Sequence, residues 1–262
     1  MHLSISNIGW AAEQDSQVYK LMQKYGFTGL EIAPTRIFPE NPYGKLDDAK
    51  KWAVKLKKQY GFSISSMQSI WYGRWEKIFG PKEEFDALVD YTKKAIDFAS
   101  VVGCKNLVFG CPRNRNLPNG ANAAVGVKFF KEIGDYAASK GTVIGIEANP
   151  PIYNTNYIND TASAIELIKK VDSTGLQLNL DMGTIIYNQE NVSKLVGNVN
   201  LISHVHISEP GLKPVERRAL HKELKDVLLV EGYQGFVSME ISKNDNIRIL
   251  DDNMQYLRGI FD

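Results

Sequence analysis

The segments KNLVFG (105–110), FFKEIGDYAASKG (129–141) and TVIGIEA (142–148) predict a strand, a helix and a second strand. The outer two are short apolar runs typical of buried strands. The middle segment ends at Gly141, as helices often end at glycine. Two strands with a helix between them are typical of a parallel pair joined by a right-handed crossover. The stretch therefore predicts one unit of an α/β fold.

The same alternation continues in both directions along the chain. Helical patterns fill the gaps, for example YTKKAIDFASVVG (91–103) and NDTASAIELIKK (159–170), where we expect Thr161 to be the N-cap. The eight strand-like runs begin 26, 34, 42, 37, 34, 25 and 35 residues apart, a spacing too regular for two unrelated domains. The other six runs are LSISN (3–7), GLEIA (29–33), SISSMQS (63–69), LQLNLD (176–181), LISHVHIS (201–208) and FVSMEI (236–241).

Eight such units in 262 residues predict a (β/α)8 TIM barrel that forms a single domain over residues 1–262. A doubly wound sheet is the alternative. Such sheets often carry a glycine-rich phosphate turn after the first strand, and ISNIGW (5–10) contains no such turn. The barrel is therefore favoured.

Composition excludes several classes of protein. With 31 Lys and Arg against 30 Asp and Glu, the net charge of +1 predicts no general surface for nucleic acid. No apolar run reaches 18 residues and the amino terminus MHLSISNIGW lacks the pattern of a signal peptide, so we expect a cytoplasmic protein without a membrane span. Two cysteines exclude a disulfide scaffold and a cysteine-rich metal site.

Four chemically capable side chains lie near the carboxyl ends of the last four predicted strands, the end where TIM barrels carry their active sites. They are Glu147 in IGIEANP, Asp181 in LNLDMG, His206 in SHVHIS and Glu240 in VSMEIS. Alone, each could be a helix cap, an ion-pair partner or a structural histidine. Together, three carboxylates at one barrel mouth would repel one another unless a cation neutralised them. We therefore predict that these four residues bind one divalent metal ion.

The predicted ligands narrow the choice of metal. Three oxygen ligands and one imidazole suit Mn²⁺, Mg²⁺ or Co²⁺, with Zn²⁺ as a further alternative. We take Mn²⁺ as the first candidate. His204 lies two residues before His206 and shares its face of the strand, so we expect it to support the site from below.

Six sequence segments resemble those of a known protein family, and the resemblance covers essentially the whole chain. The segments are IEANP, LDMG, HVHISEP, GYQGFVSMEI, YGFTGLEI and GCKNLVFG. The chain resembles the xylose isomerase-like barrel superfamily. More narrowly, it is similar to the sugar-phosphate isomerase/epimerase group, which includes D-tagatose 3-epimerase, D-psicose 3-epimerase and hydroxypyruvate isomerase. The resemblance implies a metal-dependent isomerase or epimerase of a sugar or sugar phosphate, and a homodimer or homotetramer.

In the related 3-epimerases the two metal-binding glutamates also act as acid and base on opposite faces of the sugar. By resemblance, Glu147 and Glu240 would exchange a proton at the carbon next to a carbonyl, through a metal-stabilised cis-enediolate. Two bases permit epimerisation, whereas one base gives aldose–ketose isomerisation.

The chain departs from the family at three positions around the predicted ligands. The relatives commonly have a histidine, a glutamate and an arginine where this chain has Thr184, Tyr153 and Leu212. These changes argue against a free ketohexose as substrate and leave open whether turnover is supported.

Eight further residues are candidates for binding the substrate. Aromatic rings can cover the apolar face of a sugar, and two arginines in CPRNRNLP could hold a phosphate or carboxylate. For these arginines the alternative is a solvated loop. Lys213 and His221 could replace the missing arginine, and for His221 the alternative is an exposed helix histidine. The full set is Trp10, Glu31, Gln68, Trp71, Arg113, Arg115, Lys213 and His221.

Three other functions are compatible with such a barrel. The first is a non-catalytic barrel that binds a sugar or metabolite, which the three changed positions would suit. The second is a ketosugar or inosose dehydratase that uses the same metal site. A DNA-repair nuclease like endonuclease IV is the third and is disfavoured, because its three-zinc centre needs many more than four histidines.

Overall fold

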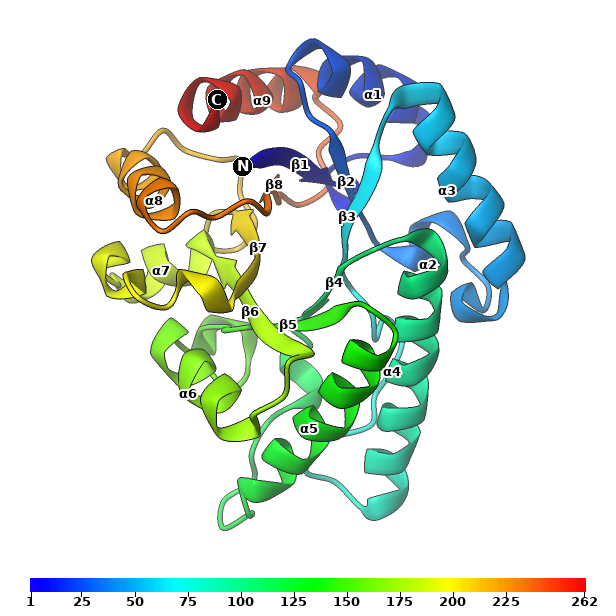
Figure 1. Cartoon of the computed structure of the whole chain (residues 1–262), viewed down its shortest axis with the longest axis vertical. Helices are drawn as coiled ribbons and strands as arrows, with labels where there is room; N and C mark the ends of the chain where they lie inside the picture. Colours follow the sequence, from blue (N-terminus) through cyan, green and yellow to red (C-terminus); the bar gives the residue numbers. More distant parts are fainter.

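Eight parallel strands form a closed barrel in the computed structural model, which describes residues 1–262 (Figure 1). Each strand pairs with its neighbours in chain order, and β8 closes the ring against β1. This arrangement confirms the predicted (β/α)8 TIM barrel. The strands are β1 (His2–Ser6), β2 (Gly29–Ile32), β3 (Ser63–Met67), β4 (Asn106–Phe109), β5 (Val143–Glu147), β6 (Leu176–Asp181), β7 (Ile202–Ile207) and β8 (Phe236–Met239).

Helices surround the barrel, and α9 brings the carboxyl terminus back beside β1 (Figure 1). None of them combines the length and the apolar character that crossing a membrane would need. The helices are α1 (Asp15–Lys24), α2 (Pro34–Ile37), α3 (Leu46–Tyr60), α4 (Lys82–Val102), α5 (Ala124–Ser139), α6 (Thr161–Val171), α7 (Met182–Asn188), α8 (Ala219–Val230) and α9 (Ile247–Phe261).

Local sequence explains where the helices begin and end. Gly103 follows α4 with a φ of 74°, a left-handed conformation that suits glycine, and its N–H donates to the last carbonyls of the helix. At α6 the structure differs from the prediction, because Asp160 rather than Thr161 is the N-cap. The Asp160 carboxylate accepts from the Ser163 N–H at 2.7 Å, and Thr161 becomes the first helical residue.

Polar side chains occupy the inside of the barrel, while apolar ones fill the layer between strands and helices. The Ser203 hydroxyl of β7 donates to Asn106 Oδ1 of β4 at 2.7 Å. The hydroxyl oxygens of Ser4 in β1 and Ser65 in β3 lie 2.5 Å apart and are hydrogen-bonded. These bonds join strands that are not neighbours in the sheet, so the side chains point inward. A Cβ on Gly145 would lie 2.5 Å from the Asn106 Oδ1, which explains the glycine in β5.

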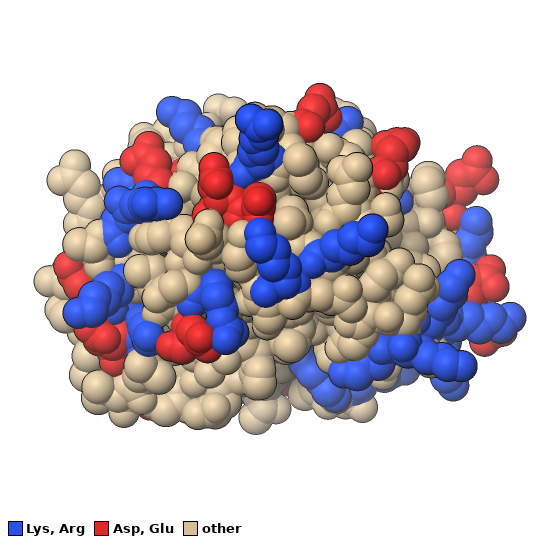
Figure 2. All heavy atoms as spheres, turned by 90° about the horizontal axis from the view of Figure 1, so that it is seen from above, with Lys and Arg blue, Asp and Glu red and all other residues tan.

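Charged side chains of both signs are interspersed over the face of the molecule shown in Figure 2. The view agrees with the nearly balanced composition of 31 basic and 30 acidic residues.

Candidate metal centre and pocket

The four predicted ligands meet at the carboxyl-terminal end of the barrel. Glu147 and Asp181 end β5 and β6, His206 lies in β7, and Glu240 directly follows β8. Their ligand atoms all lie within 4.8 Å of one another. Three carboxylates and one imidazole in such a group fit a divalent cation that prefers oxygen ligands. The cluster could therefore bind a metal ion.

The His206 ring is fully buried and lies between carboxylates on both sides. Its Nδ1 is 3.0 Å from Glu147 Oε1 and 3.2 Å from Glu240 Oε2. Its Nε2 is 2.9 Å from Glu31 Oε2. Burial would lower the pKa of the imidazole, but the charges of Glu240 and Glu31 outweigh burial and raise that pKa well above its usual value.

Crowding and burial also act on the carboxylates of the cluster. Burial raises the pKa of Asp181, and the neighbouring charge of Glu147 raises it further. Burial raises the pKa of Glu240 to about 7, against the opposing effect of His206. At both carboxylates burial outweighs the nearby His206, and a bound cation would supply further positive charge that favours their ionised forms.

Neighbouring polar groups orient the cluster. Asn179 Nδ2 donates to Glu147 Oε1 at 2.8 Å, and Asn149 Nδ2 donates to Glu147 Oε2 at 3.1 Å. The Ser208 hydroxyl donates to Asp181 Oδ1. None of these three was predicted. Asn179 could have been found, because it lies two residues before Asp181 and so shares its face of the strand.

A cavity of about 640 Å³ opens above the cluster. Three of the four predicted ligands, all except His206, line its floor. Of the predicted substrate-binding residues, Gln68, Trp71 and Arg113 also line it. The Arg113 guanidinium lies 4.2 Å from the ring centre of Trp75, which is exposed at the mouth together with Tyr72.

The three positions that depart from the family have distinct roles. Thr184 is buried and faces inward, because its hydroxyl donates to Asp181 Oδ2 at 2.9 Å and its N–H donates to the same oxygen. It orients a predicted ligand and does not reach the cavity. Tyr153 and Leu212 line the cavity, and the Tyr153 hydroxyl accepts from the Gly211 N–H at 2.9 Å.

Two predicted substrate-binding residues, Trp10 and Arg115, do not line the cavity, and their polar groups bind elsewhere in the protein. Trp10 is buried, and its indole N–H donates to Asp15 at 2.7 Å. Arg115 is fully buried and donates to the carbonyl of Glu147 at 2.8 Å and to Asn149 Oδ1 at 2.9 Å. It therefore supports the loops beneath the cavity rather than holding an anion.

Two further predicted residues, Lys213 after β7 and Glu31 in β2, also do not line the cavity. Lys213 is exposed and does not line the cavity, because Leu212 occupies that part of the wall. Glu31 is fully buried below the ligand cluster, where Gln68 donates to it at 2.7 Å.

His221 is neither exposed nor at the cavity, in contrast to both expectations from the sequence. It is fully buried in α8, and its Nδ1 lies 3.0 Å from the Tyr256 hydroxyl. Burial lowers the pKa of His221 to about 4.

The lowered pKa of His221 predicts a pH-dependent stability. Below about pH 6.5 the unfolded chain binds a proton that the folded protein excludes until about pH 4, so acidification through this window favours unfolding. We expect His221→Gln to weaken the fall in unfolding free energy between these pH values by up to about 3 kcal/mol. Urea titrations of both proteins at several pH values measure the difference, and parallel pH profiles would contradict the prediction.

We expect different effects from replacing the two arginines of the loop after β4, one on substrate binding and the other on stability. If the substrate carries a phosphate or carboxylate, Arg113→Ala should raise KM by roughly 10-fold or more, as expected for the loss of a charged hydrogen bond. Arg115→Ala should instead lower the free energy of unfolding by about 3 kcal/mol, because it leaves buried acceptors without a donor. Steady-state kinetics and urea unfolding separate the two, and an unchanged KM for anionic sugars would leave Arg113 as a loop residue.

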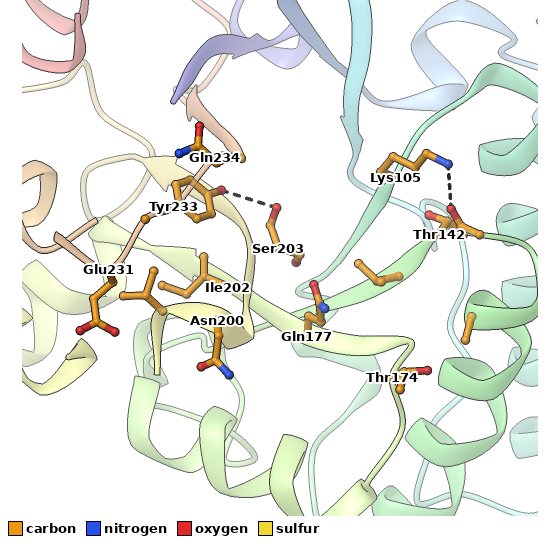
Figure 3. Close-up of a pocket in the computed structure, with 16 residues that line it drawn as sticks. Lys105, Thr142, Thr174, Gln177, Asn200, Ile202, Ser203, Glu231, Tyr233 and Gln234 are labelled. Atoms are coloured by element: carbon orange, nitrogen blue, oxygen red, sulfur yellow. Dashed lines mark hydrogen bonds between the residues drawn. The ribbon is translucent and has the colours of Figure 1, made fainter. Parts of the chain in front are cut away.

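A second cavity of about 680 Å³ lies at the opposite, amino-terminal end of the barrel (Figure 3). Lys105, Thr142, Gln177, Ser203 and Tyr233 line it, and the Tyr233 hydroxyl lies 3.5 Å from the Ser203 carbonyl. It contains none of the clustered carboxylates and histidines. In TIM barrels this end serves stability, so the cavity above the ligand cluster is the candidate site.

Fold and site together define a TIM barrel with a cluster of metal-binding residue types at the carboxyl-terminal ends of its strands. The model of the family described as xylose isomerase-like TIM barrel matches residues 19–260. The chain therefore belongs to the xylose isomerase-like TIM barrel family, which confirms the resemblance found in the sequence. No curated protein sequence matches the chain.

Several solved structures share the fold. The apo form of 3-keto-D-glucoside 4-epimerase, YcjR, from E. coli is 20% identical with a TM-score of 0.79, and the match covers 99% of both chains. D-psicose 3-epimerase from Clostridium cellulolyticum H10 is 15% identical with a TM-score of 0.78 over 100% of both chains. The probable 3-DHS dehydratase AsbF from Bacillus anthracis is 16% identical with a TM-score of 0.71 over 98% of both chains.

Proposed function

We propose that the protein is a metal-dependent isomerase or epimerase of a sugar or sugar phosphate. The observation that carries this proposal is the convergence of Glu147 and Glu240 from β5 and β8. Both carboxylates line the floor of the cavity and both contact His206 Nδ1. The solved sugar epimerases with the same fold support the substrate class.

The reaction needs a base that removes a proton from the carbon next to a carbonyl, and an acid that returns it. Glu147 and Glu240 are the candidates, because they are the glutamates that line the cavity. A divalent cation held by Glu147, Asp181, His206 and Glu240, for which Mn²⁺ is our first choice, would stabilise negative charge on the substrate oxygens. Trp71 and Gln68 would contact the sugar at the cavity wall.

Exchange of substrate protons with solvent tests this proposal. The protein loaded with Mn²⁺ is incubated in D₂O with a panel of ketoses, 3-keto-glycosides and ketose phosphates, and the recovered sugars are examined by NMR. We expect deuterium at the carbon next to the carbonyl of at least one sugar. A matched control is the Glu147→Gln/Glu240→Gln double variant, which should incorporate none. A sugar that binds in the cavity without any exchange would instead indicate a non-catalytic binding barrel.

A second candidate function is dehydration of a ketosugar, favoured by Tyr153 at the position where relatives commonly have glutamate. The Tyr153 hydroxyl reaches the cavity and accepts a hydrogen bond from the backbone, so its own proton is free to be donated. Dehydration begins with the same proton removal, after which a protonated hydroxyl leaves as water. A product lighter by one water, detected by mass spectrometry and lost in Tyr153→Phe, would favour the dehydratase.

A further inference from the structure

A fully buried carboxylate lies directly below the ligand cluster. Glu31 belongs to β2 and has no solvent-exposed surface. Its Oε2 lies 2.9 Å from His206 Nε2 and 2.8 Å from His204 Nε2, and its Oε1 accepts from Gln68 Nε2 at 2.7 Å. Glu31 is therefore on the side of the His206 ring opposite to Glu147 and Glu240.

A carboxylate buried this deeply needs partners that offset the cost of removing it from water. Moving an ionised carboxylate into a protein interior costs several kcal/mol, and only partners that donate hydrogen bonds offset that cost. The His206 imidazole and the Gln68 amide are those partners, while His204 Nε2 lies 2.8 Å away without the geometry of a hydrogen bond. Because Glu31 can only accept when ionised, the contact with His206 requires a proton on His206 Nε2.

A proton on Nε2 has a direct consequence for the other ring nitrogen. When a metal ion replaces the proton on Nδ1, an imidazole that keeps Nε2–H offers its lone pair from Nδ1, and Nδ1 is the atom that faces Glu147 and Glu240. Histidines that bind metals commonly donate their other N–H to a carboxylate, which fixes the ring and makes the ligand more basic.

We propose that Glu31 is a positioning residue that holds His206 with Nε2 protonated and Nδ1 free to bind the metal. The role rests on the proposed function, since it concerns the metal site proposed there. Glu31 does not reach the cavity, so this role replaces the substrate contact expected from the sequence.

A second metal ion is the rival explanation for the same contacts, because the ligand atoms of Glu31, His204 and His206 also lie within 4.8 Å of one another. Hydrogen bonds already account for both oxygens of Glu31. A second metal at this position would also require His206 to give up its Nε2 proton and bridge two ions. We therefore expect one metal ion per chain.

Metal affinity and stoichiometry test the proposal without a substrate. Mn²⁺ is titrated into wild type and Glu31→Gln, and free Mn²⁺ is followed by electron paramagnetic resonance. We expect one ion per wild-type chain and a dissociation constant about 10–100-fold higher for Glu31→Gln. Glu31→Asp, which keeps the charge, should bind more tightly than Glu31→Gln. The matched control is Glu209→Gln, which changes the other buried glutamate outside the ligand set, paired with Arg218, and should bind Mn²⁺ like wild type.

A spectroscopic measurement separates positioning from a general loss of structure. The chain has four histidines, so imidazole NMR spectra of the Zn²⁺-loaded protein are simple to assign. We expect a protected His206 Nε2–H at low field in wild type and Glu209→Gln, shifted upfield in Glu31→Gln. Equal Mn²⁺ affinity in wild type and Glu31→Gln, or two ions per chain, would overturn the positioning role alone. A wild-type chain that binds no Mn²⁺ would overturn the proposed function as well.

Discussion

Replacing Glu240 with glutamine is expected to lower turnover at least about 100-fold, and up to about 10⁴-fold, while the fold is retained. The change keeps the shape of the side chain and one oxygen that can bind metal, but it removes the charge and the proton acceptor. The buried position of Glu240 beside His206 makes the loss specific, because no other carboxylate follows β8 in the cavity.

Metal content must be measured in the same samples, since Glu240 is proposed both as ligand and as base. The informative comparison is the rate of solvent deuterium exchange per bound Mn²⁺ in Glu240→Gln and Glu147→Gln. Loss of exchange in both variants supports a two-base epimerase. Loss in only one, with metal retained in both, indicates a one-base isomerase. Exchange at a near wild-type rate in metal-loaded Glu240→Gln would exclude Glu240 as an essential base.

The barrel could be predicted from the sequence because its strands are short apolar runs at regular intervals. The observed β6 has the predicted bounds 176–181, and the other strands differ by a few residues at their ends. The error at the start of α6 has a local cause. Asp160 and Thr161 are both good N-cap residues, and periodicity does not tell which of two adjacent candidates accepts the first hydrogen bond.

The ligand cluster could be predicted because topology determines where strand ends meet. Glu147, Asp181, His206 and Glu240 occupy equivalent places on four consecutive strands, and a closed barrel brings such places together. Loop residues carry no such constraint. Arg115 and Arg113 are two apart in one loop, yet one is fully buried and the other exposed, and this depends on tertiary contacts that the sequence does not reveal.

The role of Glu31 illustrates a further limit. A charged residue at the end of a strand predicts a polar contact at the barrel mouth, but its depth depends on the register between β2 and β7, which are not neighbours. Only the structure shows that the Glu31 carboxylate contacts His206 Nε2 and does not line the cavity.

Removing the metal should abolish turnover and also lower the thermal stability of the folded protein. Without a cation the three carboxylates of the cluster repel one another in a buried site, so a metal that binds only the folded state stabilises it by mass action. Adding Mn²⁺ at about 100 times its dissociation constant to the chelator-treated protein should add about 2.7 kcal/mol. For a chain of this length, that corresponds to a rise in Tm of about 5–10 °C.

Asp181→Asn gives the sharpest control for that measurement, because it should leave the metal-free protein at least as stable while weakening the stabilisation by Mn²⁺. Asparagine is a good N-cap residue and can still accept from the Thr184 N–H at the start of α7, while the repulsion from Glu147 disappears. The metal-free variant should therefore be at least as stable as metal-free wild type, yet Mn²⁺ should raise its Tm much less. Differential scanning calorimetry with and without Mn²⁺ measures both quantities. An equal rise in wild type and Asp181→Asn would place the bound Mn²⁺ away from this cluster and would contradict the proposed ligand set.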